Sequence, residues 1–199
     1  MVKNNQSYKG LFISDIDWIN NARINCFHGF DVFAEGYYNG ADILVNHVIE
    51  NGTGQDTLVY PIVFLYRQHL ELRFKEIIRE GWLLLNEGQD FRITHDLQIL
   101  WGQVKEVIKK LWPDEEKTQE ESLIEHIVDE FSTLDRQSFS FRYPEDTQGN
   151  NPLAGLQYIH IRHLSEMMQE AYNFLYGVSA AIVHYRSLAS EYSSDCWYE

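Results

Sequence analysis

Apolar residues recur along this chain three to four positions apart, which is the spacing of helices that bury one face. The clearest stretch spans 58–85, and its apolar face is formed by Val63, Tyr66, Leu70, Phe74, Ile77 and Ile78. A second stripe lies between Thr94 and Pro113, formed by Leu97, Leu100, Trp101, Val104, Val107, Ile108 and Leu111. Thr94 suits the N-cap of this helix, with Asp96 in its first turn, and Pro113 stops it. Each of these two segments is therefore predicted to form a helix with one buried face.

The segment before them predicts a first helix over about 15–50. Ser14 is its expected N-cap, and the turn-forming residues 51–54 end it. Because glycine weakens a helix interior, we expect a break near Gly36 or Gly40.

Within the helix over 58–85, Pro61 suits the first turn. Glu71 and Lys75 form a favourable i,i+4 pair on the side away from the apolar face. The same helix carries a polar stripe that either lines a cavity of the bundle or, as is usual, forms a solvated face: His69, Arg73 and Glu76.

Two more helices follow an acidic loop over 114–121. The core-facing positions of the fourth are Ile124, Ile127, Val128, Phe131 and Leu134. The last is expected over about 153–191, with a stripe formed by Leu164, Met168, Ala171, Leu175, Val178, Ile182 and Tyr185. Between them lies a polar connection over 135–152, long enough to suggest a functional role, and any strands would form a short hairpin around 137–143. The pattern predicts one all-α domain over 1–199, an up-and-down antiparallel bundle of about five helices with one long irregular loop before the last helix.

Charge and composition restrict the partners of this domain. The formal net charge of −14 over 199 residues argues against a protein that coats DNA or RNA along its whole surface, although a local basic pocket fits within an acidic shell. No apolar run reaches the roughly 18 residues that span a membrane. The N-terminus lacks the apolar core of a signal peptide. Two cysteines, Cys26 and Cys196, are too few for a disulfide framework or a metal cage, so we expect a cytoplasmic protein with reduced thiols.

Three short motifs occur in a suggestive order along the chain. The second helix carries His69-Leu-Glu-Leu-Arg-Phe-Lys-Glu-Ile-Ile78, the third begins with Thr94-His-Asp-Leu97, and Phe141-Arg-Tyr-Pro144 lies in the long connection. This order resembles the HEPN superfamily over about 58–185. The resemblance implies an up-and-down helical bundle, frequently a homodimer, associated with nucleotide binding, RNA cleavage, toxin–antitoxin pairs and phage defence.

The resemblance departs from the ribonucleases of that superfamily at one motif. Those members carry an arginine and a histidine separated by four to six intervening residues, near the start of a late helix. Arg142 is followed by no histidine before His160, and the literal match, Arg23 to His28, lies in the expected first helix. Side chains at i and i+5 of a helix point about 140° apart, so Arg23 and His28 would converge only with partners across a dimer. The pattern is therefore closer to the branch that binds nucleotides or partner proteins.

The candidate site residues lie at two places. His95 and Asp96 begin the third helix, where they either form a pair near a phosphate or serve as a cap and a packing residue. Arg142 and Tyr143 lie in the long connection, where Arg142 either clamps a phosphate beside a base stacked on Tyr143 or pairs with Asp135 or Asp96. Arg73 joins them as a candidate ligand-binding residue.

The sequence motifs for metal or cofactor binding are weaker. His160, His163 and Glu166 have helical spacing, but no Glu-x-x-His pair or cysteine supports a metal site, so a structural or solvent-facing role is favoured and no metal is expected. No glycine-rich phosphate loop is present, and no cofactor is expected.

The leading functional hypothesis is a HEPN-like nucleotide- or RNA-associated protein of a prokaryotic defence or toxin–antitoxin system, as a homodimer or with a partner protein. If it is an enzyme, metal-independent RNA cleavage would use Arg142, His95 and the Arg23–His28 pair. The alternative is a non-catalytic acidic module that binds a partner protein.

Overall fold

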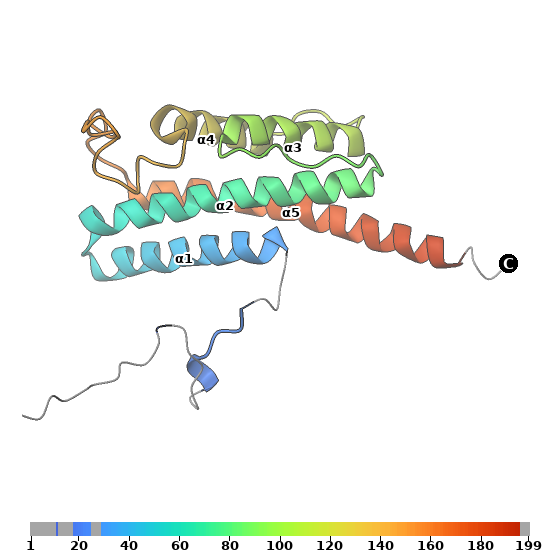
Figure 1. The fold of residues 1–199 in the computed structure, drawn as a ribbon, viewed down its shortest axis with the longest axis horizontal. Helices are drawn as coiled ribbons and strands as arrows, with labels where there is room; N and C mark the ends of the chain where they lie inside the picture. Colours follow the sequence, from blue (N-terminus) through green and yellow to red (C-terminus); the bar gives the residue numbers. More distant parts are fainter. Residues whose placement is uncertain (1–10, 12–17, 25–28, 196–199) are drawn as a thin grey trace, which may run out of the picture.

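The computed structural model describes residues 11, 18–24 and 29–195. It contains a short 3-10 helix and five α-helices: η1 Trp18–Asn20, α1 Phe30–Asn51, α2 Gln55–Leu84, α3 Leu97–Leu111, α4 Gln119–Asp135 and α5 Ile161–Asp195. No strand occurs in the described part of the chain. Figure 1 shows the helices side by side, with the irregular segment before α5 at one end. The all-α class, the number of helices and the long loop before the last helix are confirmed.

The contacts give the direction of each helix relative to α2. Gly52, in the left-handed conformation with φ of 63°, ends α1 and lets the chain turn into an antiparallel α1–α2 hairpin. Phe74 packs on Trp101 and Gly81 lies against Val107, so α3 runs in the same direction as α2. That direction is possible because residues 86–96 run back along α2 before α3 begins (Figure 1). The alternation of an up-and-down bundle therefore has one exception, between α2 and α3.

Helix α2 lies at the centre and packs against α1, α3 and α5. Its predicted apolar face is buried throughout, since Val63, Tyr66, Leu70, Phe74, Ile77 and Ile78 are at most 3% exposed. The predicted stripe of α3 is buried except for Ile108 and Leu111, which are partly exposed at its end. Burial of this much apolar area is the main term that stabilises the bundle.

The first helix differs from its prediction at its start and at its glycines. It begins at Phe30, and residues 21–24, which were expected to be helical, are irregular. Ser14, the expected N-cap, lies outside the described residues. Helix α1 continues through Gly36 and Gly40, so the expected break is wrong. Burial of Ala34, Tyr38, Ala41, Val45 and Val48 against the other helices keeps this segment helical despite the glycines.

Helix α2 begins earlier than its prediction. The Gly54 carbonyl accepts the Thr57 and Leu58 N–H groups and so begins the helix at Gln55. Pro61 consequently lies in the second turn, not the first, and removes one backbone hydrogen bond there.

The N-cap of α3 and the start of α5 also differ from their predictions. Asp96, not Thr94, caps α3, because the Asp96 carboxylate accepts the Gln98 N–H at 3.0 Å. Thr94 instead accepts the Asp96 N–H through its hydroxyl. Helix α5 begins at Ile161 and not near 153, and His160 caps it through a hydrogen bond from the His163 N–H to His160 Nδ1 (3.1 Å). The sequence pattern places helices correctly, but side-chain caps set where they begin.

The irregular segment and two expected core positions also differ. Residues 137–143 form turns and not a hairpin. Leu134 and Tyr185 were expected in the core but are 37% and 46% exposed. Leu134 lies in the last turn of α4, and the ring of Tyr185 lies 6.4 Å from that of Trp112 at the end of α3, so both side chains are only partly covered.

Gly81 permits the close approach of α2 and α3. A Cβ atom at Gly81 would lie 2.2 Å from Val107 Cγ1, whereas one at Gly102 would meet nothing within 4 Å. We expect Gly81→Ala to lower the free energy of unfolding by about 1–3 kcal/mol, since the two helices must move apart.

The matched control is Gly102→Ala on the exposed side of α3, which should raise the free energy of unfolding by up to about 1 kcal/mol through helix propensity. Urea denaturation of both variants measures the two changes. Equal changes of the same sign would contradict close packing at Gly81.

Candidate functional site

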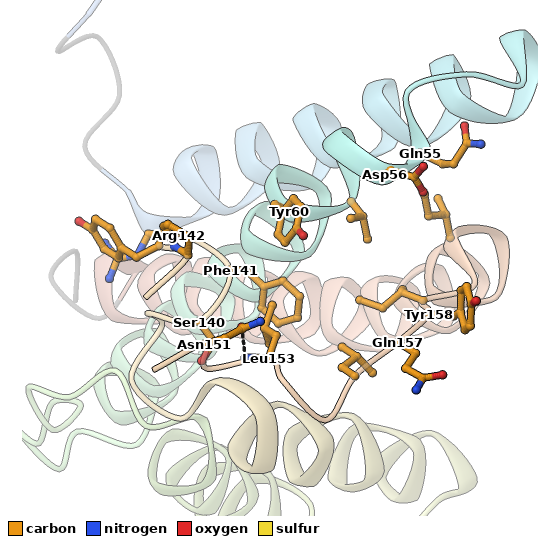
Figure 2. Close-up of a pocket in the computed structure, with 16 residues that line it drawn as sticks. Gln55, Asp56, Tyr60, Ser140, Phe141, Arg142, Asn151, Leu153, Gln157 and Tyr158 are labelled. Carbon is orange, nitrogen blue, oxygen red and sulfur yellow. Dashed lines mark hydrogen bonds between the residues drawn. The ribbon is translucent and has the colours of Figure 1, made fainter. Parts of the chain in front are cut away.

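A cleft of about 720 Å³ opens between the start of α2 and the irregular segment before α5. Its polar lining comes from Gln55, Asp56 and Tyr60 on α2 and from Ser140, Arg142, Tyr143, Asn151, Gln157 and Tyr158 on the segment. Figure 2 shows Arg142 at one end of the cleft, Tyr60 and Phe141 in the middle, and Gln157 and Tyr158 at the other end. Its volume is in the range of small-molecule sites in proteins.

Arg142 is the cation of this cleft. Its guanidinium carbon lies 5.7 Å from the ring centre of Phe64 and 5.5 Å from that of Tyr143, and its Nε donates to the Ser138 carbonyl at 2.5 Å. It makes no ion pair with the described acidic residues, so the predicted pairing with Asp135 or Asp96 is wrong. Those carboxylates pair with Arg67 and Arg136 instead. The terminal nitrogens of Arg142 thus remain on an exposed side chain at the cleft.

Tyr143 lies beside Arg142 and packs on Phe139, with the ring centres 4.7 Å apart. It is half exposed, as is Tyr60, and Tyr158 is 89% exposed. An exposed aromatic ring held by a second ring offers a flat surface for stacking, and amide side chains nearby offer donors and acceptors. The cleft therefore combines one cation, three tyrosines and three side-chain amides with a single carboxylate, Asp56.

A buried arginine, Arg67, fastens the segment that carries Arg142 to the bundle. Arg67 is fully buried, and its Nε and Nη2 donate to the carbonyls of Asp135 (3.1 Å), His95 (2.6 Å) and Arg136 (3.2 Å). Its Nη1 donates to Glu71 at 3.3 Å. One guanidinium thereby joins α2, the start of α3 and the end of α4.

Asp135 continues this connection into the irregular segment. Its Oδ1 accepts the N–H groups of Phe139 (2.5 Å) and Ser140 (2.7 Å), and its Oδ2 lies 3.6 Å from Arg67 Nε. The last residue of α4 therefore folds the turn that precedes Arg142. The position of Arg142 depends on a buried carboxylate several residues away.

His95 lies outside the cleft. Its Nδ1 is 2.9 Å from Oε1 of the buried Glu71, which also accepts from Lys75 at 2.7 Å. Burial raises the pKa of Glu71, but hydrogen bonds from Lys75 and His95 outweigh it and leave the pKa below its usual value. The imidazole is 66% exposed, so the carboxylate orients a ring that solvent can reach. Glu71 was expected on an exposed face; the structure buries it and keeps its predicted pair with Lys75.

Asp96, next to His95, has a structural role. It caps α3, and its Oδ2 accepts from Arg136 Nε at 2.7 Å. Burial raises the pKa of Asp96, while hydrogen bonds from Arg136 and from backbone N–H groups lower it further than burial raises it. Neither His95 nor Asp96 lines the cleft. The structure thus places Arg142 and Tyr143 at the cleft and His95 and Asp96 outside it.

The polar stripe of α2 is buried where α2 packs against α1 and α5, so the prediction of a solvated face is wrong. Arg73 Nη1 donates to Glu76 at 2.5 Å and its Nη2 to Glu35 on α1 at 3.2 Å. Ser179 on α5 donates to Glu76 at 2.5 Å, and Tyr172 donates to Glu35 at 2.9 Å. Arg73 therefore lies in an interhelical network and not at the cleft.

His69 lies in the same interface as a buried neutral ring. Its Nδ1 donates to the Ala34 carbonyl at 2.9 Å, because a carbonyl only accepts, and Nε2 has no hydrogen-bond partner among the described residues. The rings of Tyr38 and Tyr172 lie 5.2 and 5.7 Å from it. Burial lowers the pKa of His69 to about 4, with a further contribution from the nearby charge of Arg73.

The remaining candidates do not assemble a site. Arg23 is exposed in the irregular residues 21–24, not in a helix, and His28 lies outside the described residues. His160 caps α5, and no group of three or more metal-binding side chains forms in the described part of the chain.

Comparison with known proteins gave no match to a family model, a curated protein or a solved structure. Among the described helices, none is both long enough and apolar enough to cross a membrane.

The buried imidazole of His69 predicts a loss of stability in acid. The unfolded chain binds a proton at His69 as the pH falls through about 6.5, whereas the folded chain does so only near 4. The stabilisation from neutral His69 is therefore complete above pH 6.5 and is lost between 6.5 and 4. We expect it to contribute a fall of about 2 kcal/mol in the free energy of unfolding from pH 7.5 to pH 5.

Urea denaturation across this range should show a shallower pH dependence for His69→Asn, which keeps a donor for Ala34 and cannot titrate. His184→Asn, which replaces an exposed imidazole, is the matched control and should keep the wild-type dependence. Parallel curves for wild type and His69→Asn would show that His69 does not cause the acid sensitivity.

Proposed function

We propose that this chain is a HEPN-like nucleotide- or RNA-associated protein that binds its ligand in the cleft beside Arg142. The observation that carries the proposal is the placement of an exposed guanidinium next to exposed tyrosine rings in one cleft of about 720 Å³. Arginine presents parallel N–H donors that match phosphate oxygens, and tyrosine rings stack on bases. Amides at Gln55, Asn151 and Gln157 supply the donors and acceptors that a base edge requires.

The charge of the chain limits the kind of nucleic acid that it binds. With a net charge of −14, a long duplex would be repelled by most of the surface. A ligand with few phosphates, bound locally at Arg142, avoids this cost. A nucleotide or a short single strand fits better than a long double-stranded nucleic acid.

The positions of Arg142 and His95 favour binding of a ligand over cleavage of RNA. Metal-independent RNA cleavage needs a base and an acid beside the phosphate that a cation holds. Arg142 lines the cleft, whereas His95 lies outside it beside Glu71. A role in prokaryotic defence or in a toxin–antitoxin pair stays a prediction of the family resemblance.

Replacement of Arg142 tests the proposal. Arg142→Ala should weaken binding of a fluorescein-labelled single-stranded RNA about tenfold to a hundredfold, since a charge-assisted contact to phosphate is lost. Tyr143→Ala should weaken it about tenfold through lost stacking. Fluorescence anisotropy at low salt measures both.

Arg92→Ala is the matched control, because Arg92 is exposed and does not line the cleft. It should bind RNA with wild-type affinity. Equal affinities of wild type, Arg142→Ala and Arg92→Ala would contradict the proposed site, and so would the absence of binding by wild type to RNA and mononucleotides.

A second candidate function, a module that binds a partner protein or a second copy of itself, is favoured by exposed apolar side chains on two neighbouring helices. Val32, Phe33 and Ile43 on α1 and Tyr176 and Val183 on α5 are each at least 40% exposed. We expect a homodimer by analytical ultracentrifugation and a shift toward monomer in Phe33→Glu. A monomer at all concentrations would leave the homodimer without support.

A further inference from the structure

A second cavity of about 270 Å³ adjoins the cleft between α4, α5 and the irregular segment. The cleft and this second cavity share four lining residues, Phe141, Leu156, Tyr158 and Ile159. The two spaces therefore lie on either side of one wall.

The second cavity has an apolar floor and a polar rim. Val63, Phe131 and Met168 on its floor are buried. Its rim carries the imidazoles of His126, His160 and His163, all of which are exposed. An apolar space with polar imidazoles at its edge suits a nucleobase, which has two apolar faces and a polar edge.

The tautomer of one rim imidazole follows from the cap of α5. His160 Nδ1 accepts the His163 N–H at 3.1 Å, so this nitrogen carries no proton. The neutral ring therefore carries its proton on Nε2, which can donate to a ligand. Glu130, 3.3 Å from His126 Nε2, is the carboxylate of this rim.

The position of Tyr158 connects the two spaces. Tyr158 lines both and is 89% exposed, so its ring has no cover in the described structure. Figure 2 shows Arg142 and Tyr158 at opposite ends of the cleft. A ligand that contacts Arg142 and also stacks on Tyr158 therefore spans the length of the cleft.

We propose that the second cavity holds the base of a neighbouring nucleotide, so that the ligand is a short single-stranded oligonucleotide and not a mononucleotide. This inference rests on the proposed function, because Arg142 holds a phosphate of the same strand. The strand crosses Tyr158, whose ring stacks on a base at the entrance to the second cavity.

Titration calorimetry of the full chain with AMP and with the 5′-phosphorylated dinucleotide pApA tests this inference. The two probes share a terminal phosphate and a first base, so the difference in affinity reports the second nucleotide alone. We expect wild type to bind pApA about tenfold more tightly than AMP, the gain from one additional stacked base.

Two variants alter the second cavity and leave the lining of the cleft intact. Leu134→Trp places a large ring in the second cavity from α4. The double variant His126→Ala/His163→Ala removes two rim imidazoles but keeps the hydrogen bond from the backbone N–H of residue 163 to His160 Nδ1. Both should bind AMP like wild type and lose most of the gain for pApA. Thermal unfolding checks that each variant is folded.

The outcomes separate this inference from the proposed function. Equal affinities of wild type for AMP and pApA, or a gain for pApA that both variants retain, would overturn the inference and leave the cleft as a mononucleotide site. Binding of neither probe, nor of a longer single strand, would overturn both.

Discussion

The buried guanidinium of Arg67 is the interaction on which the arrangement of this bundle depends. It donates to three carbonyls from two distant parts of the chain, at His95 before α3 and at Asp135 and Arg136 at the end of α4, and it pairs with Glu71 on its own helix. An ionised side chain without exposed area is costly unless its charge and its donors are matched. These carbonyls come within reach of Arg67 only when the start of α3 and the end of α4 lie beside the same turn of α2. Arg67 thus selects one arrangement of helices that apolar packing alone would leave less defined.

The position of the cleft is a consequence of this arrangement. Asp135 faces Arg67 with one oxygen and folds the turn over 136–140 with the other, and Arg142 follows directly. The second polar network, around Arg73 and Glu76, joins α1, α2 and α5 without reaching the cleft. The molecule therefore contains one polar network that positions the cleft and another that fastens the remaining helices. Arg142 and Tyr143 stay accessible because other arginines satisfy the nearby acids.

The sequence predicts well those features that depend on local apolar spacing, such as the buried faces of α2 and α3. It predicts poorly the role of charged residues on the same helices. Arg67 attracts no notice as a single arginine, because the carbonyls that it binds belong to residues far away along the chain. Arg73 and Glu76 have the spacing of a solvated stripe, because their partners Glu35 and Ser179 are equally distant in sequence. Arg136 and Arg142 lie six residues apart in the sequence, and only the fold decides that Arg136 pairs with Asp96 and that Arg142 does not. Arg142 and Tyr143 line the cleft, whereas His95 lies outside it because residues 86–96 carry it to Glu71.

The claim that Arg67 holds the Arg142 segment is tested most directly by hydrogen–deuterium exchange of Arg67→Lys. Lysine keeps the charge beside Glu71 and Asp135 but loses the planar set of donors that reaches three carbonyls. The account predicts faster exchange of the amides over 95–98 and 136–143, with exchange over the buried parts of α1 and α2 unchanged. Arg79→Lys, at an exposed arginine that pairs with Asp90, provides the control and should leave 136–143 protected. Wild-type exchange over 136–143 in Arg67→Lys, or a uniform increase along the whole chain, would contradict the account.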